Sequence, residues 1–182
     1  MSEVTKVAVL GGGSFGTIIA NMVAENGIQV SHWMRDQKRV DEIETGRENT
    51  RYLPGYKLAE GLLPTTDMQE AVTGAQLIFV SIPSHSFRSV VKQAREWLTP
   101  SQMLVSTTKG IEAETFSLMS EILRDELPKG RIGVLSGPNL AKEVAQRQLT
   151  ATVIASDDNE LRELAQKVLH SAYFRVYASD DT

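Results

Sequence analysis

Cysteine is absent from this 182-residue chain. Its absence excludes disulfides, thiolate nucleophiles and cysteine metal sites, and it favours a reducing compartment such as the cytoplasm. The segment Met1–Lys6 has no secretory signal pattern, which agrees with a cytoplasmic location. No apolar run approaches the ~20 residues of a membrane span, so we expect no stable membrane insertion.

An excess of positive charge is also missing. The chain has 19 basic and 23 acidic residues and a net charge of -4, which gives no reason to expect nucleic acid or an anionic membrane as a partner. His85 and His170 have no neighbours at metal-ligand spacing, so we predict no metal site. A phosphate ligand stays open, because phosphate sites are built locally.

Short apolar segments alternate with helical patterns along the chain. Each segment is bounded by polar residues, glycine or proline, and most are apolar on both faces, as in strands covered by helices on both sides. Helical stripes run through Phe15–Val23, Phe87–Leu98 and Leu161–Leu169. The expected strands are Val7–Leu10, Ile28–Met34, Leu77–Val80, Met103–Val105, Ile132–Leu135, Ala151–Ala155 and Phe174–Tyr177.

This order predicts an α/β fold of the Rossmann type, a doubly wound, mainly parallel sheet with helices on both faces. We expect residues 1–182 to form one domain of this type. Asp157 is the predicted N-cap of the last helix, with Glu160 three residues on. The stretch Gly46–Thr66 has no regular pattern and holds a turn signal at Tyr52–Gly55.

A glycine motif follows the first strand. Gly11, Gly13 and Gly16 have the G-x-G-x-x-G spacing, after Val7–Leu10 and at the start of the Phe15–Val23 helix. The first glycine allows a tight turn, the second lets a pyrophosphate approach the backbone, and the third lets the helix pack on the sheet. The motif therefore predicts a dinucleotide site at the helix N-terminus; the alternative is a purely structural turn.

The tip of the second strand bears on which dinucleotide binds. NAD sites usually carry an acid there, whereas this chain has Arg35, whose guanidinium suits a 2′-phosphate. We expect NADP or NAD as cofactor, with NADP favoured. In the alternative, Arg35 is a solvated charge and Asp36 caps the next helix. His32 is interpreted as a packed or edge-strand histidine rather than a catalytic one.

Three later loops follow strands at the same edge of the sheet, where ligands bind in this fold. In the first, Pro83 sets a rigid turn and Ser84 is a candidate helix cap. In the second, Lys109 can pair with an anionic substrate or polarise a carbonyl. In the third, Pro138 fits the first turn of a helix and Asn139 adds an amide. Each loop also has a structural alternative. The first could be a plain capped turn, the lysine of the second could be solvated, and the third could be an ordinary helix start.

With these loops, the chain resembles the bacterial-type NAD(P)-dependent glycerol-3-phosphate dehydrogenases over nearly its whole length. The lysine-glycine and Ser-Gly-Pro loops are more specific than the glycine motif. The matching segments are Val7–Thr17, Arg51–Gly55, Ser106–Glu112 and Ser136–Glu143.

The resemblance implies reversible, NAD(P)H-dependent reduction of dihydroxyacetone phosphate to sn-glycerol 3-phosphate for phospholipid synthesis. It implies cofactor contacts at Ser14, Phe15, Arg35, Lys109 and Ala141, beside Gly11, Gly13, Gly16 and Pro83 from the loops above. It implies a substrate side at Lys109, Gly137 and Asn139.

In the family the catalytic lysine lies in a helical second domain, which we expect to be absent here. No catalytic residue is therefore assigned within this chain, and we expect it to bind cofactor and catalyse little alone. A homodimer is the candidate assembly of the full-length protein. The alternatives are a ketopantoate reductase type or other two-domain dehydrogenase, and a dinucleotide-sensing domain without enzymatic activity.

Overall fold

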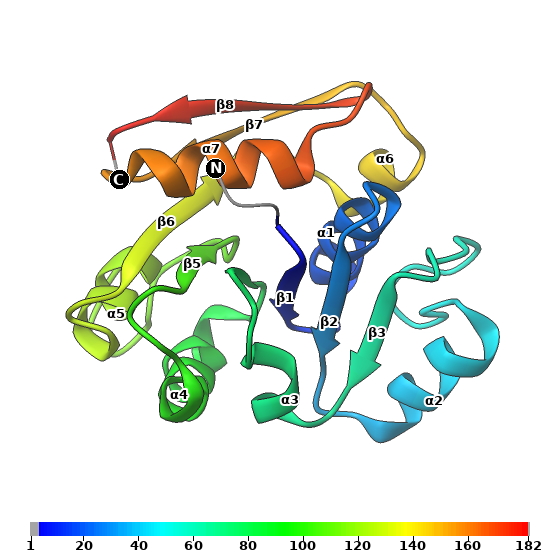
Figure 1. Cartoon of the computed structure of the whole chain (residues 1–182), viewed down its shortest axis with the longest axis horizontal. Coiled ribbons are helices and arrows are strands. Elements are labelled where there is room, and N and C mark those ends of the chain that lie inside the picture. The colour runs from blue at the N-terminus through cyan, green and yellow to red at the C-terminus, as the bar shows by residue number, and fades with distance from the viewer. Residues whose placement is uncertain (1–3, 182) are drawn as a thin grey trace.

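An eight-stranded sheet forms the centre of the computed structural model, which describes residues 4–181 (Figure 1). The strand order is β3-β2-β1-β4-β5-β6-β7-β8, and every neighbouring pair is parallel except β6 and β7. The strands are β1 Lys6–Leu10, β2 Gln29–Trp33, β3 Leu62–Thr65, β4 Leu77–Val80, β5 Met103–Ser106, β6 Arg131–Ser136, β7 Thr150–Ala155 and β8 Phe174–Ser179.

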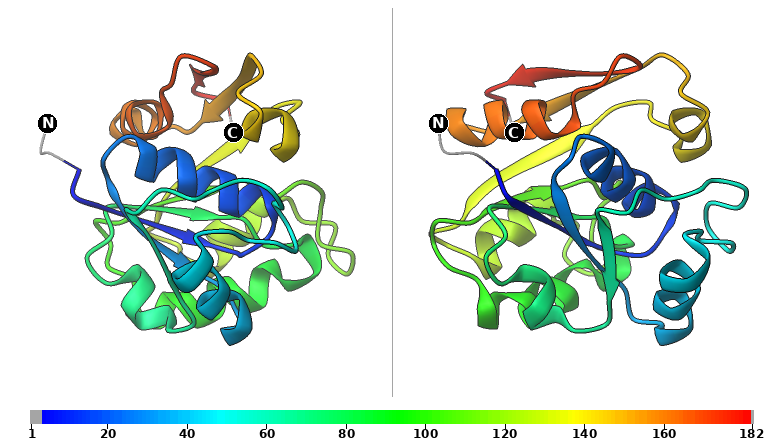
Figure 2. Two further views of the ribbon diagram at one scale, coloured as in Figure 1. Left: turned by 90° about the vertical axis from the view of Figure 1, so that its right-hand side faces the viewer. Right: turned by 45° about the vertical axis from the view of Figure 1, so that its right-hand side comes forward.

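Helices cover both faces of this sheet (Figure 2). One face packs against α1 and α7, and the other against α3, α4 and α5, with a separate apolar core under each layer. The predicted fold class is therefore confirmed. The helices are α1 Ser14–Glu25, α2 Gln37–Gly46, α3 Met68–Val72, α4 Ser84–Ala94, α5 Met119–Glu126, α6 Ala141–Ala145 and α7 Asn159–Leu169, with a short 3₁₀ helix at Arg95–Trp97.

Strand β1 lies where the strand order changes direction, between β2 and β4. Val7 and Val9 point into one core, and Ala8 and Leu10 into the other, so the strand is apolar on both faces. Ligands of doubly wound sheets bind beyond the carboxyl ends of the strands at such a switch point. The loop after Leu10 is therefore the place to look for a site.

The last two strands differ from the expectation. Ala151–Ala155 was predicted to be covered on both faces, but α7 covers only one face of β7 and β8 (Figure 1). Val153 is 39% exposed on the other face, beside its register partner Tyr177, which is 59% exposed. An apolar strand pattern alone does not distinguish a strand covered twice from one covered once.

Three predicted helix starts were wrong. Asp158, not Asp157, caps α7, and its carboxylate accepts from the Leu161 backbone N–H at 3.1 Å. Ser84 is the first residue of α4 rather than its cap, since the N-cap is Pro83. Pro138 lies before α6, which begins only at Ala141. For α7, two neighbouring aspartates compete for the cap, whereas α4 and α6 start after Pro83 and Leu140, neither of which provides a side-chain cap.

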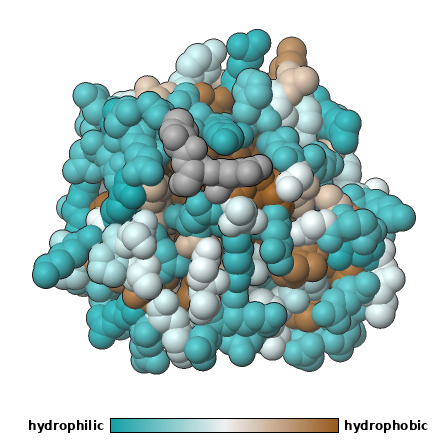
Figure 3. Space-filling view, in the orientation of Figure 1, coloured by the Kyte–Doolittle hydropathy of each residue, from teal (hydrophilic) through white to brown (hydrophobic). Residues whose placement is uncertain are grey.

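Strand β3 falls inside the Gly46–Thr66 stretch that showed no regular pattern, and it contains Pro64 at the edge of the sheet. Of the expected N-terminal segment Met1–Lys6, Met1–Glu3 lie outside the described residues. Within residues 4–181, no helix is long and apolar enough to cross a membrane. The face in Figure 3 is mostly hydrophilic, with scattered apolar residues.

Candidate nucleotide-binding site

The glycine motif forms the turn from β1 into α1. Gly11 has a φ of 124°, in the region that favours glycine, and a Cβ there would strike the Ser81 carbonyl oxygen. A Cβ on Gly16 would strike the carbonyl oxygen of Gly11, so the first turn of α1 lies directly against the loop. These two glycines are required by the packing of the protein itself.

Gly13 is different, because a Cβ built on it meets no atom within 4 Å. Its φ of -77° suits any residue, so neither backbone conformation nor internal packing requires glycine there. It is the N-cap of α1 and makes no side-chain cap, which leaves backbone N–H groups of the first turn available. Such an N-terminus, with open space above it, fits an anionic phosphate.

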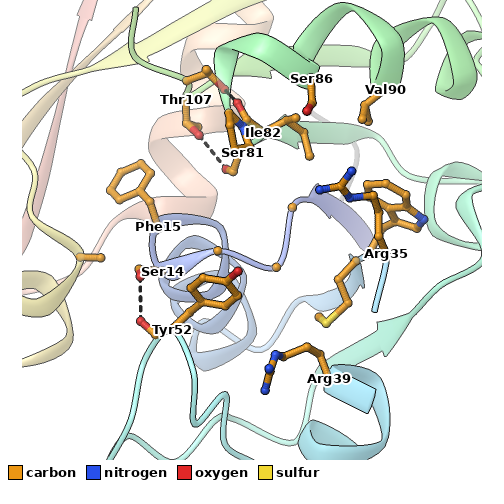
Figure 4. A pocket seen from close by; sticks show the side chains of 18 of the residues that line it. Ser14, Phe15, Arg35, Arg39, Tyr52, Ser81, Ile82, Ser86, Val90 and Thr107 are labelled. Carbon is orange, nitrogen blue, oxygen red and sulfur yellow. Dashed lines mark hydrogen bonds between the residues drawn. The ribbon is translucent and has the colours of Figure 1, made fainter. Parts of the chain in front are cut away.

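A cavity of about 740 Å³ opens at this turn (Figure 4). A cavity of this size is typical of small-molecule and cofactor sites. Gly16 lies beneath the loop, and Gly16 and Gly137 are not among the residues that line it. The predicted cofactor residues that do line it are Gly11, Gly13, Ser14, Phe15, Arg35, Pro83, Lys109 and Ala141.

A second loop, which we call the Asn49–Leu53 loop, is bound to the glycine turn. The buried Asn49 amide donates to the Gly12 carbonyl at 3.0 Å and to Thr17 Oγ1 at 2.9 Å. Ser14 Oγ donates to the Tyr52 carbonyl at 2.7 Å, as Figure 4 shows. Sequence reasoning missed Asn49, whose role depends on contacts with residues more than 30 positions away.

His32 lies fully buried in β2, with Nε2 2.9 Å from the Gly11 carbonyl oxygen. Burial lowers the pKa of this imidazole to about 4, although the bond to Gly11 acts in the opposite direction. The ring is therefore neutral near pH 7 and donates from Nε2. The interpretation as a packed histidine is confirmed; β2 is not an edge strand.

Beyond β2, Arg35 is exposed and lines the cavity. Asp36 caps α2, accepting from the Lys38 backbone N–H at 3.1 Å, so the alternative role considered for this acid is present. It also lines the cavity. The segment directly after β2 therefore presents a cation, Arg35, and an acid, Asp36, to the cavity.

The predicted substrate side is brought together only in part. Lys109 Nζ donates to the Gly137 carbonyl at 3.0 Å, which joins the lysine loop to the Ser-Gly-Pro loop. Asn139 lines the cavity, but its Nδ2 donates to the Ala151 carbonyl at 2.9 Å. Its amide N–H therefore anchors the loop to β7. With only five residues, α6 provides no extended N-terminal anion site.

The lysine loop is anchored from behind by an ion pair. Arg88 on α4 donates to both carboxylate oxygens of Glu112, at 2.8 and 3.1 Å through Nε and at 2.8 Å through Nη2. Hydrogen bonds from Arg88 hold the pKa of Glu112 at about 2. Arg88 also reaches Glu126 on α5 at 2.9 Å, so the pair ties the loop to two helices.

The loop after β4 is also tied to the lysine loop. Ser81 Oγ and Thr107 Oγ1 lie 2.6 Å apart, and Thr108 Oγ1 donates to the Ile82 carbonyl at 2.7 Å. All four residues line the cavity, next to Pro83. The floor of the cavity is thus a set of interlocked turns at the carboxyl ends of β1, β4 and β5.

Comparison with curated proteins gives close relatives. The chain is 56% identical over 181 residues to a glycerol-3-phosphate dehydrogenase (NAD(P)+) of Pseudomonas fluorescens strain SBW25, covering 100% of this chain and 53% of the relative. It is 55% identical, with the same coverage, to the protein of that name from Pseudomonas aeruginosa strain LESB58. The chain spans about half the length of the curated relatives it matches.

Solved structures agree with this similarity. A glycerol-3-phosphate dehydrogenase from Coxiella burnetii superposes with a TM-score of 0.93 at 32% identity, covering 98% of this chain and 55% of that one. A pyrroline-5-carboxylate reductase from the same organism, at 16% identity and a TM-score of 0.72, shares the fold alone. The family model described as the NAD-dependent glycerol-3-phosphate dehydrogenase N-terminus matches residues 6–162, and the chain belongs to that family.

Proposed function

We propose that this chain is the nucleotide-binding part of an enzyme that interconverts dihydroxyacetone phosphate and sn-glycerol 3-phosphate with NAD(P)H. The observation that carries the proposal is the open space over Gly13 at the N-terminus of α1, in a chain of this family. Because neither φ nor packing requires glycine there, the space is explained by a phosphate that approaches the backbone.

The cofactor side follows from the cavity. Gly11, Gly13 and the α1 amides would hold the pyrophosphate, with Ser14 and Phe15 at the same turn. Arg35 would meet the adenosine end, and Pro83 and Ala141 would contact the cofactor elsewhere in the same cavity. The bound cofactor supplies or accepts the hydride, and the protein orients it and stabilises charge on the substrate.

The substrate side is proposed at Lys109, with Gly137 and Asn139 beside it. The Lys109 ammonium already faces a carbonyl oxygen, that of Gly137, at 3.0 Å, so an anionic or carbonyl group could take over this donor. A cation there would stabilise negative charge that develops on the substrate oxygen. The remaining groups, including the catalytic lysine, are proposed to come from a helical second domain in the length of the relatives that this chain does not match.

We favour NADP over NAD, because Arg35 at the tip of β2 suits a 2′-phosphate better than a ribose hydroxyl. Asp36 at the same rim could still accept from ribose hydroxyls, which supports use of both cofactors. We further propose a cytoplasmic location, a role in supplying glycerol 3-phosphate for phospholipid synthesis, and a homodimer for the full-length protein.

Two measurements test the function. Calorimetry on the 182-residue chain should detect binding of NADPH or NADH. A chimaera that joins this chain to the unmatched half of the Pseudomonas fluorescens relative should then oxidise NADPH or NADH when dihydroxyacetone phosphate is added. The chain alone should turn over little. A folded chimaera that binds the cofactor without reducing this substrate would contradict the proposal.

A further inference from the structure

We propose that Arg39, held against the ring of Tyr52, is a second residue that selects NADPH over NADH by binding the 2′-phosphate. The inference rests on the proposed function, since it assumes that a dinucleotide occupies the cavity. Arg39 lies on α2, whereas the preference for NADP was proposed above from Arg35 at the tip of β2 alone.

The charge around the cavity favours a phosphate in addition to the pyrophosphate. Its lining contains Arg35, Arg39, Arg51 and Lys109 against a single acid, Asp36, although the whole chain carries a net charge of -4. Three of these cations are arginines: Arg35 follows β2, Arg39 lies on α2, and Arg51 lies in the Asn49–Leu53 loop. A guanidinium is the group best matched to phosphate oxygens.

Arg39 carries a buried donor that has no hydrogen-bond partner. Its side chain is 13% exposed, and Nη1 is paired with Glu42 at 2.7 Å. Nε has no hydrogen-bond partner, and Asp36 Oδ2 lies 3.8 Å away, beyond hydrogen-bond range. A buried N–H without a partner is rare, and a phosphate oxygen at the cavity wall would satisfy it.

Tyr52 lies beside that guanidinium. The ring centroid is 6.0 Å from the Arg39 guanidinium carbon and 5.1 Å from that of Arg51, so both cations lie within cation–π range of one aromatic ring. Tyr52 in turn is held by the Ser14 hydroxyl, which donates to its carbonyl. In Figure 4, Arg39 lies next to Tyr52, and Arg35 lies further along the cavity.

These contacts connect the two ends of the site. The glycine turn positions Tyr52 through Ser14, and Tyr52 positions Arg39, while Glu42 holds the far side of the guanidinium. A surface ion pair between Arg39 and Glu42 alone would not require the arginine to line the cavity or leave Nε without a partner. We therefore infer a ligand role for Nε.

The test is calorimetric titration of the 182-residue chain with NADPH and with NADH. Arg39→Gln should weaken NADPH binding by about 10- to 100-fold, the range for loss of a hydrogen bond to a charged group. NADH binding should change less than about 3-fold, because it lacks the phosphate that Arg39 contacts. Lys38→Gln, which removes a charge from an exposed neighbour outside the cavity lining, is the matched control and should leave both affinities unchanged.

Equal weakening of both cofactors by Arg39→Gln, or no change in either, would overturn the inference. Should Arg39→Gln not fold, as judged by circular dichroism, Arg39→Lys decides, because it keeps the charge beside Glu42 but removes Nε. It should then lose NADPH affinity selectively, and unchanged selectivity would overturn the role. Wild-type protein that binds neither cofactor would instead contradict the proposed function, which is a distinguishable result.

Discussion

The imidazole of His32 donates from Nε2 to the carbonyl oxygen of Gly11, over 2.9 Å and wholly inside the protein. This bond joins β2 to the first glycine of the turn between β1 and α1. It requires a proton on Nε2, because a carbonyl oxygen can only accept, and a second proton on Nδ1 would have no hydrogen-bond partner among the described residues. A charged ring would be buried without a counter-ion, which explains why burial lowers the pKa of His32.

Stability should therefore fall in acid through His32. Between its usual pKa of 6.5 and its folded-state value of about 4, the unfolded chain binds more protons than the folded one. The free energy of unfolding should decline as the pH falls through this window, by about 3 kcal/mol in total from this residue. Urea unfolding at several pH values measures the effect.

The variant His32→Gln should have a flatter stability profile between these pH values. His170→Gln, which removes an exposed histidine, serves as control and should keep the wild-type profile. If His32→Gln and wild type lose stability in parallel as the pH falls, the buried imidazole is not the source of the acid sensitivity.

Gly13→Ala should separate binding from folding. The added methyl group meets no protein atom within 4 Å, and the backbone conformation allows it, so the melting temperature should stay within a few degrees of wild type. Binding of NADPH and NADH should both weaken by about 10-fold or more, because the methyl group occupies the space proposed for the pyrophosphate. Gly46→Ala, which also has open space, should change neither property. Undiminished binding by a folded Gly13→Ala protein would argue against a phosphate at this turn.

Asn49→Ala should destabilise the fold and loosen the Asn49–Leu53 loop. The substitution leaves the Gly12 carbonyl and the Thr17 hydroxyl without their donor in a buried place, which costs about 1–3 kcal/mol. Denaturant unfolding measures the loss. Asn159→Ala removes an exposed amide bonded to Glu163, and it should cost less than about 0.5 kcal/mol. Similar costs for the two variants would show that the tie between the loops contributes little.

Arg88→Leu should release the loop that carries Lys109. Without the guanidinium, Glu112 loses the partner that holds the loop against α4 and α5. Amide hydrogen exchange of residues 107–118 should quicken, while the exchange of β1 should be unchanged. Lys92→Met is the control, because Lys92 lies on the same helix and pairs with Glu126 at 3.6 Å but donates no hydrogen bond to Glu112 among those found for the described residues. Unchanged exchange in residues 107–118 would mean that the loop is held by its own turns.

The fold and the glycine turn could be predicted because their signals are local. The spacing of Gly11, Gly13 and Gly16 and the apolar strands before and after them occupy short stretches of sequence, and they encode one turn. In contrast, β3 is four residues long and contains Pro64, so it carries too little pattern to stand out from the turns around it.

The rest of the site depends on contacts between distant residues. The contacts of Asn49 and Arg39 exist because the fold places the Asn49–Leu53 loop beside the glycine turn and α2. Asn139 is a similar case, since its own segment does not reveal that its Nδ2 donates to the Ala151 carbonyl of β7. A side chain's neighbours across the sheet cannot be derived from its own segment, so such roles remain beyond sequence patterns.

The close approach of Gly16 to the Gly11 carbonyl has a thermodynamic consequence. It packs the first turn of α1 tightly against the glycine loop, so the proposed pyrophosphate site should be preorganised and should lose little conformational entropy when a nucleotide binds. The proposed adenosine end is lined by long arginine side chains, whose rotamers would be restricted on binding. General affinity would then arise at the rigid glycines, and discrimination between nucleotides at the adaptable cations.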